Sequence, residues 1–117
     1  MSLQRDLPGM NYAAITGIIK RRKGINMTRS GIAVLHLLVE NTVTHPGSLE
    51  TTVAEIEVDV WGNLATALDS KLHEGDAVFI EGRLAHKKSE DRAGGEHFKT
   101  LLRARRIEIM AKKERKA

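Results

Sequence analysis

The side chains with the clearest chemical use in this sequence are grouped cations. Four consecutive basic residues occupy positions 20–23, and further cations recur over positions 83–92 and 103–106. Lys and Arg side chains that line a groove hold the phosphates of a single nucleic-acid strand. A charge run more often forms a solvated surface, but three groups in one small chain favour binding. The predicted phosphate-binding residues are Lys20, Arg21, Arg22, Arg29, Arg83, Lys87, Lys88, Arg92, Arg103 and Arg105.

Two aromatic side chains are candidates for contact with nucleic-acid bases. Trp61 is the only tryptophan, and it closes a segment in which apolar and acidic residues alternate. Its position is in phase with the acidic residues, which places it on the outward face of a strand. A base stacked on an aromatic ring contributes on the order of 1–3 kcal/mol to binding. Packing at the end of the strand is the alternative for Trp61, and anchoring of the preceding loop is the alternative for Phe98.

An acidic row on the same predicted face opposes phosphate binding. Glu55, Glu57 and Asp59 alternate with apolar residues and share the phase of Trp61. Cross-strand cations such as Arg103 or Arg105 would neutralise this row. Without such partners, a bound strand would have to follow a different path.

Catalytic and metal-binding chemistry finds no support in the sequence. The five histidines lack the spacing of metal ligands. The absence of cysteine excludes disulfides and thiolate metal sites. No Gly-x-Ser-x-Gly motif, P-loop or pair of inward carboxylates occurs. We therefore expect a protein that is not an enzyme and has no catalytic residue, metal site or cofactor.

Length and charge limit the class of protein. The 117 residues suffice for one domain, and 41% hydrophobic with 29% charged residues is ordinary for a globular protein. No apolar run approaches the roughly 20 residues of a membrane span, and no signal peptide is recognisable, so a cytoplasmic protein is expected. Residues 1–81 hold 7 Lys and Arg against 10 Asp and Glu, whereas residues 82–117 hold 12 against 5. The basic character therefore lies in the last third.

Hydrophobic periodicity predicts an all-β protein. Five segments carry strand patterns, and one short segment between the third and fourth repeats apolar residues at helical spacing. Five long strands with one such helix form a five-stranded Greek-key barrel of the OB type, whereas a sandwich would need more strands. A leader over 1–9, a domain over 10–110 and a disordered basic tail over 111–117 are expected. The predicted strands span 11–23, 32–42, 50–61, 76–86 and 98–110, the helix spans 63–71, and a polar loop spans 87–97.

Two irregularities are expected within the strands. Gly17, inside the first strand, indicates a bulge or a close backbone approach, or merely a weak strand position. In the fifth strand the apolar phase shifts near Arg105 and Arg106. Ile107 and Ile109 reach the same face as the preceding apolar residues only if a bulge intervenes.

The second strand is apolar on both of its predicted faces. Val34, His36 and Leu38 are expected to point outward, and an outward apolar row suggests cover by another subunit. The opposite set points into the core, and its members are Ala33, Leu35, Leu37 and Val39.

Several of these positions together resemble the bacterial single-stranded DNA-binding protein family. The resemblance covers roughly residues 10–110 and implies an OB barrel, assembly into dimers or tetramers, and sequence-tolerant binding of single strands. It implies roles in DNA replication, repair and recombination, with RNA as an alternative strand. The residues that carry it are Gly17, Ser30-Gly31, Trp61-Gly62-Asn63-Leu64-Ala65, Leu72, Gly75-Asp76, Val78, Ile80-Glu81-Gly82-Arg83-Leu84 and Arg106-Ile107.

The sequence departs from the family pattern in its aromatic residues and at its end. Glu55 and Ser89 stand about where further stacking tryptophans are expected, and residues 112–117 do not match the family's acidic tail tip. Recruitment of replication proteins through that tail is therefore not carried over. A short member with few aromatics also resembles the dimeric primosomal replication protein. The second functional hypothesis is accordingly an assembly module that binds replication or primosome proteins and holds nucleic acid weakly.

Overall fold

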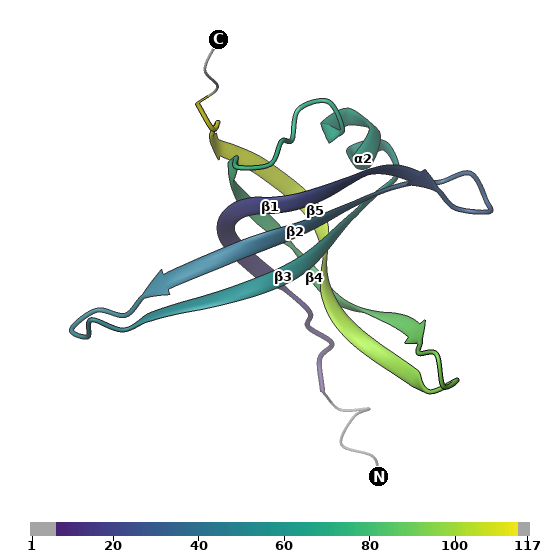
Figure 1. Cartoon of the computed structure of the whole chain (residues 1–117), viewed down its shortest axis with the longest axis horizontal. Coiled ribbons are helices and arrows are strands. Elements are labelled where there is room, and N and C mark those ends of the chain that lie inside the picture. Colours follow the sequence, from purple (N-terminus) through teal and green to yellow (C-terminus); the bar gives the residue numbers. More distant parts are fainter. Residues whose placement is uncertain (1–6, 115–117) are drawn as a thin grey trace.

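Five strands form a closed barrel in this computed structural model, which describes residues 7–114. The strands follow one another around the barrel in the order β1-β2-β3-β5-β4 (Figure 1). Only β3 and β5 pair in parallel, and the other pairs are antiparallel. The predicted all-β barrel with one short helix between the third and fourth strands is confirmed. The elements are β1 (Ala13–Met27), β2 (Ala33–Thr44), β3 (Thr51–Trp61), α2 (Gly62–Leu68), β4 (Ala77–Glu90) and β5 (Glu96–Ala111).

The barrel interior is filled by alternate residues of every strand, and α2 packs against one end. Ala65 of α2 and Leu72 in the segment after it are fully buried against the strands. Burial of one such leucine contributes about 1.5–3 kcal/mol to folding. The predicted inward set of the second strand is confirmed, because Ala33, Leu35, Leu37 and Val39 all lie in this core.

Gly17 lies where β1 crosses closely over β2. A Cβ atom at this position would stand 2.5 Å from the carbonyl oxygen of Glu40 and 2.6 Å from the side chain of Val39. The predicted close backbone approach is therefore confirmed. The pairing of β1 with β2 shifts register a little further on, between Ile19 and Arg21, so β1 bends there to close the barrel.

A bulge in β5 corrects the apolar phase of that strand. Glu81 pairs with Arg106 and Gly82 pairs with Ala104, which leaves Arg105 as the extra residue. This insertion returns Ile107 to the core side, so the predicted bulge is confirmed.

Long hairpins extend from the barrel, and their lengths correct the sequence prediction. Residues 40–55 of β2 and β3 and residues 86–100 of β4 and β5 form two separate arms, which we call the β2–β3 arm and the β4–β5 arm (Figure 1). The predicted loop over 87–97 is wrong, because only a turn over 91–95 is unpaired. The backbone ladder supplies its own hydrogen bonds, so polar residues can continue both strands into solvent.

Two further boundaries differ from the prediction by three residues or more. β1 continues to Met27, so Gly24 lies inside the strand and the turn to β2 comes later. α2 ends at Leu68, three residues before the predicted end at Lys71. Asp69 instead begins the segment that leads to β4, and its carbonyl and carboxylate are bonded by Arg22.

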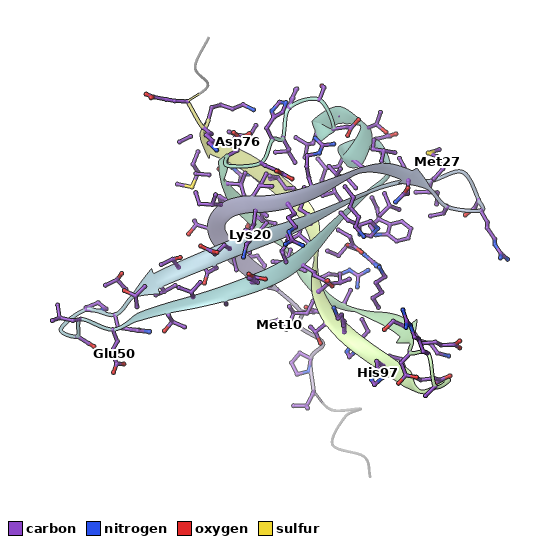
Figure 2. The ribbon with its side chains drawn as sticks, viewed as in Figure 1. Met10, Lys20, Met27, Glu50, Asp76 and His97 are labelled. Atoms are coloured by element: carbon purple, nitrogen blue, oxygen red, sulfur yellow. The ribbon has the colours of Figure 1, made fainter. Side chains whose placement is uncertain are left out.

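The chain after β5 is fastened to the start of β4 through Asp76. Asp76, labelled in Figure 2, is only 1% exposed. Its carboxylate accepts hydrogen bonds from the Lys112 ammonium at 2.9 Å and from the Lys113 N–H at 3.1 Å. Burial opposes its ionisation, but these bonds and the N–H of His73 hold the pKa of Asp76 below its usual value. Of the predicted leader and tail, residues 1–6 and 115–117 lie outside the described part of the chain.

Candidate nucleic-acid interface

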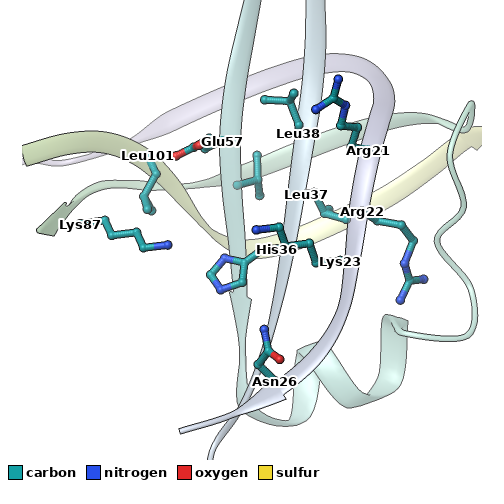
Figure 3. Close-up of a pocket in the computed structure, with 11 residues that line it drawn as sticks. Arg21, Arg22, Lys23, Asn26, His36, Leu37, Leu38, Glu57, Lys87 and Leu101 are labelled. Carbon is teal, nitrogen blue, oxygen red and sulfur yellow. The ribbon is translucent and has the colours of Figure 1, made fainter. Parts of the chain in front are cut away.

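Two adjoining cavities form one groove across the outer face of β1, β2 and β3, opposite the base of the β4–β5 arm. The first encloses about 370 Å³ and the second about 260 Å³, and Asn26, His36 and Lys87 line both (Figure 3). The first also contains Arg21 and Lys23, and the second contains Trp61 and Arg103. We call this continuous surface, from Trp61 to Arg21, the Trp61 groove.

Trp61 stands at one end of this groove with its ring held from one side. The Arg103 guanidinium carbon lies 4.8 Å from the centre of the indole ring, within the range of a cation–π contact. Arg103 is fixed in turn by Asp59, with Nε donating to Oδ1 at 3.1 Å and Nη2 to Oδ2 at 3.2 Å. The Trp61 residue is 37% exposed, so one ring face is covered and part of the ring remains accessible to a base.

Val34 faces away from the barrel core, as predicted, but its side chain is not exposed to solvent. Val34 pairs with Trp61 across β2 and β3 and is only 4% exposed, although it lies outside the barrel core. It lines the same cavity as Trp61, so the groove residues cover it. An exposed outward row on β2 therefore does not exist at this end, and Val34 forms part of the groove floor.

Each acid of the predicted acidic row has a basic partner on another strand: on β1 for Glu55, and on β5 for Glu57 and Asp59. Lys20 bonds Glu55, Lys99 lies 3.4 Å from Glu57, and Arg103 holds Asp59. Hydrogen bonding and charge attraction from Lys20 lower the pKa of Glu55, and the same contact raises the pKa of Lys20. The predicted neutralisation of the acidic row by Arg103 is confirmed at Asp59. The face of Trp61 is therefore not a repulsive surface for phosphate.

Only some of the predicted cations line the groove, and only some of those have no partner for their charge within the described chain. Arg21 and Lys87 line it and form no ion pair with any residue of the described chain. Arg22 lines it too, but its guanidinium binds the carbonyls of Asp69 and Leu72 behind α2. Arg22 therefore fastens the segment after α2 to β1.

The remaining predicted cations lie around the groove or away from it. Lys88 forms an ion pair with Glu96 at 2.8 Å, and Lys20 is paired as described above. Arg29 and Arg92 occupy the turns of the β1–β2 and β4–β5 hairpins, which flank the groove. Arg83 is exposed on β4 but lines neither cavity, and Arg105 lines a separate cavity.

An aromatic series continues from Trp61 toward the β4–β5 arm. His86 lines the same cavity as Trp61, and its ring meets Phe98 edge to face with centroids 6.2 Å apart. Phe98 is 63% exposed, so its ring is open to a stacked base. The sequence prediction named Trp61 and Phe98 but not His86, which reaches Phe98 only through the pairing of β4 with β5.

His36 and Asn26 are two further groove residues that the predicted site did not include. Burial lowers the pKa of His36, and the nearby charge of Lys87 lowers it further, so the ring is neutral near pH 7.

Within residues 7–114, no group of three His, Asp or Glu side chains is placed to hold a metal ion. No helix in that range is long and apolar enough to cross a membrane.

Comparison with known proteins places this geometry in context. Residues 10–110 match the model of the Single-strand binding protein family. A protein of Deinococcus radiodurans named single-stranded DNA-binding protein is 32% identical over 106 residues, which cover 88% of this chain and 35% of the relative. A protein of the same name from Thermus aquaticus is 28% identical over 99 residues, covering 85% of this chain and 37% of the relative. The chain thus spans little more than a third of the length of these relatives.

Proposed function

Because the chain belongs to the Single-strand binding protein family, we propose that its barrel binds single-stranded DNA along the Trp61 groove. The accessible part of the Trp61 ring, beside the unpaired charge of Lys87, is the observation that carries this proposal. Bases stack on the aromatic ring, and phosphates lie near Lys87 and Arg21, an arrangement that is largely independent of sequence. RNA offers the same two groups and is an alternative strand.

The proposed role is non-enzymatic. Single strands arise in the cytoplasm during DNA replication, repair and recombination, and a barrel of this kind protects or presents them. Residues 10–110 form the proposed binding unit, because both cavities of the groove and all five strands lie within it or extend at most one residue beyond it.

A second candidate is an assembly module that binds another protein, such as a replication or primosome component. A largely apolar cavity favours a protein contact; its lining includes Ile15, Leu38, Ile56 and Leu84, together with Glu55, Glu57 and Lys99. The two functions differ in their response to salt. DNA binding weakens steeply as salt rises because bound phosphates release counterions, whereas burial of apolar surface does not.

The stacking role predicts a loss of affinity in Trp61→Ala. Binding of poly-dT, measured by anisotropy of a labelled strand, is expected to weaken by about 1–3 kcal/mol because one base loses its stacking surface. Trp61→Phe keeps an aromatic face and serves as the matched control. Unchanged affinity in folded Trp61→Ala would assign the ring to packing. Quenching of Trp61 fluorescence by poly-dT provides a second readout in the unmodified chain.

The charge of Lys87 predicts a change in salt dependence. Lys87→Gln is expected to lower affinity for all sequences alike and to flatten the plot of log affinity against log salt by about 0.7, the value for one phosphate contact of a single strand. Lys88→Gln is the matched control, because Lys88 is paired with Glu96 and lines neither cavity. A larger loss in Lys88→Gln than in Lys87→Gln would contradict the proposed path.

We also propose that the chain forms a homodimer or homotetramer through unpaired strand edges. Pairing of β1 with β2 ends at Glu40, and β5 pairs only with Val58 and Asp59 of β3. The β2–β3 arm therefore has two open edges, and its Val43 and Val53 side chains are exposed. Open edges with exposed apolar residues pair with other chains.

Sedimentation at micromolar concentration is expected to show at least a dimer. The double variant Val43→Lys/Val53→Lys is expected to shift it toward monomer, because charged residues on an edge oppose pairing. Substitution of the exposed Thr66 by Lys on α2 controls for added charge. A monomeric unmodified chain would contradict the proposal.

A further inference from the structure

The Trp61 groove contains two neutral polar side chains with unused hydrogen-bonding capacity. In residues 7–114, neither the Asn26 amide nor the His36 ring forms a hydrogen bond with another part of the chain. Both line both cavities, and Figure 3 shows them projecting into the groove from β1 and β2. The groove thus contains donors and acceptors in addition to the cations that phosphates need.

The strand register explains why these two groups meet. Lys23 pairs with His36 and Asn26 pairs with Val34, with a register shift in β1 between the two pairs. The irregular segment therefore brings Asn26 alongside β2 within two residues of His36. Val34 pairs in turn with Trp61, so both polar groups stand close to the ring along adjacent strands.

The chemistry of the two groups suits a base edge better than a phosphate. A neutral His36 ring has one donor and one acceptor nitrogen, and the Asn26 amide has two donor hydrogens and one acceptor oxygen. An acceptor turned toward a phosphate would oppose its charge, whereas base edges present donors beside acceptors. Lys87, Arg21 and Lys23 in the same groove already offer positive charge to the backbone.

We propose that Asn26 and His36 hydrogen-bond to the edge of the base that stacks on Trp61, so that the groove discriminates among bases at one position. The inference rests on the proposed function, because it needs a strand in the Trp61 groove. Elsewhere along the groove the contacts are with phosphates and ring faces, and they leave binding tolerant of sequence. The chain thus has a single base-selective position within a largely unselective path.

The test compares the affinities of labelled homopolymers of dA, dC and dT, equal in length, for the full chain at pH 7.5. Stacking within free poly-dA affects all protein variants equally, so the ratio of tightest to weakest affinity is compared between variants. In Asn26→Ala and His36→Phe this ratio is expected to fall by about fivefold, the lower end of the effect of one base-edge pair. His36→Phe retains a ring and so separates hydrogen bonding from stacking.

Lys23→Gln is the matched control, because it changes another groove residue that is suited to phosphate. It is expected to weaken binding of all three homopolymers alike and to leave the ratio unchanged. A ratio that stays unchanged in both Asn26→Ala and His36→Phe, with binding intact, overturns the inference but not the proposed function. Failure of the unmodified chain to bind any homopolymer overturns both. A fall in the ratio of tightest to weakest affinity in either variant supports base recognition by the substituted residue.

Discussion

Replacement of Arg103 by Met is expected to lower the free energy of unfolding by about 3 kcal/mol, the lower end of the cost of breaking a buried ion pair. Asp59 is 3% exposed, and both hydrogen bonds that its carboxylate accepts in the described chain come from Arg103. Without the guanidinium, a buried carboxylate loses its charge partner. The lower end applies because the Arg103 side chain is itself 29% exposed, so water can reach part of the vacated space. Urea denaturation followed by circular dichroism measures the change.

The double variant Asp59→Leu/Arg103→Met separates the loss of stability caused by an unpaired charge from the net contribution of the ion pair to the free energy of unfolding. It removes both charges, and it is expected to recover most of the stability lost in Arg103→Met. Asp59→Leu alone leaves a partly exposed cation and is expected to be the milder single variant. Equal stability of Arg103→Met and the unmodified chain would show that water solvates Asp59.

The same substitution tests whether Arg103 acts on DNA through Trp61. Arg103→Met is expected to weaken poly-dT binding and to change the emission of Trp61, because the guanidinium no longer covers one ring face. In the Trp61→Ala background it is expected to add little further loss. Additive losses in the double variant would instead assign Arg103 a direct contact with phosphate.

The fold was predictable because its determinants are local in the sequence. Alternating segments identify the strands, the helical spacing after Trp61 identifies α2, and the phase shift near Arg105 identifies the bulge that the structure contains. The ends of the β4–β5 arm were not predictable from apolar periodicity. Residues 87–90 and 96–97 are polar or charged, and the backbone pairing that keeps them in strands leaves no apolar pattern in the sequence.

The groove was predictable only in part, because its composition depends on which strands are neighbours. Trp61, Arg103 and Lys87 were predicted from residue type, and the pairing of β3 with β5 brings the first two into contact. The same residue types mislead where a cation has a partner inside the chain. The bonds of Arg22 to Asp69 and Leu72 join residues 47 and 50 positions apart, a separation that no local pattern contains.

Gly82→Ala is expected to lower the free energy of unfolding by about 3 kcal/mol, which is the upper end of the usual cost of overpacking. A Cβ atom at Gly82 would stand 2.0 Å from the carbonyl oxygen of Arg103 and 3.0 Å from the Cα atom of Ala104. Both are backbone atoms, so no side-chain rotation relieves the clash. The bulge at Arg105 brings β5 this close, and β4 and β5 must separate to admit the methyl group.

Gly24→Ala provides the matched control for Gly82→Ala. Gly24 also lies inside a strand, its φ is not positive, and a Cβ atom there meets nothing within 4 Å. The control is expected to leave stability unchanged or to raise it by about 0.4–1 kcal/mol, because alanine reduces the freedom of the unfolded chain. Equal urea midpoints for the two variants would contradict the close approach at Gly82.

The clash at Gly82 also involves Arg103, whose guanidinium lies over the Trp61 ring, so stability and DNA binding are expected to change together. Separation of β4 from β5 moves the backbone of Arg103, and its guanidinium then no longer meets both Asp59 and the indole ring. Folded Gly82→Ala, measured well below its unfolding temperature, is therefore expected to bind poly-dT more weakly and to show altered Trp61 emission. Full binding with lowered stability would instead show that the Asp59–Arg103 contact adjusts to the shift, and that Trp61 is positioned from β3 alone.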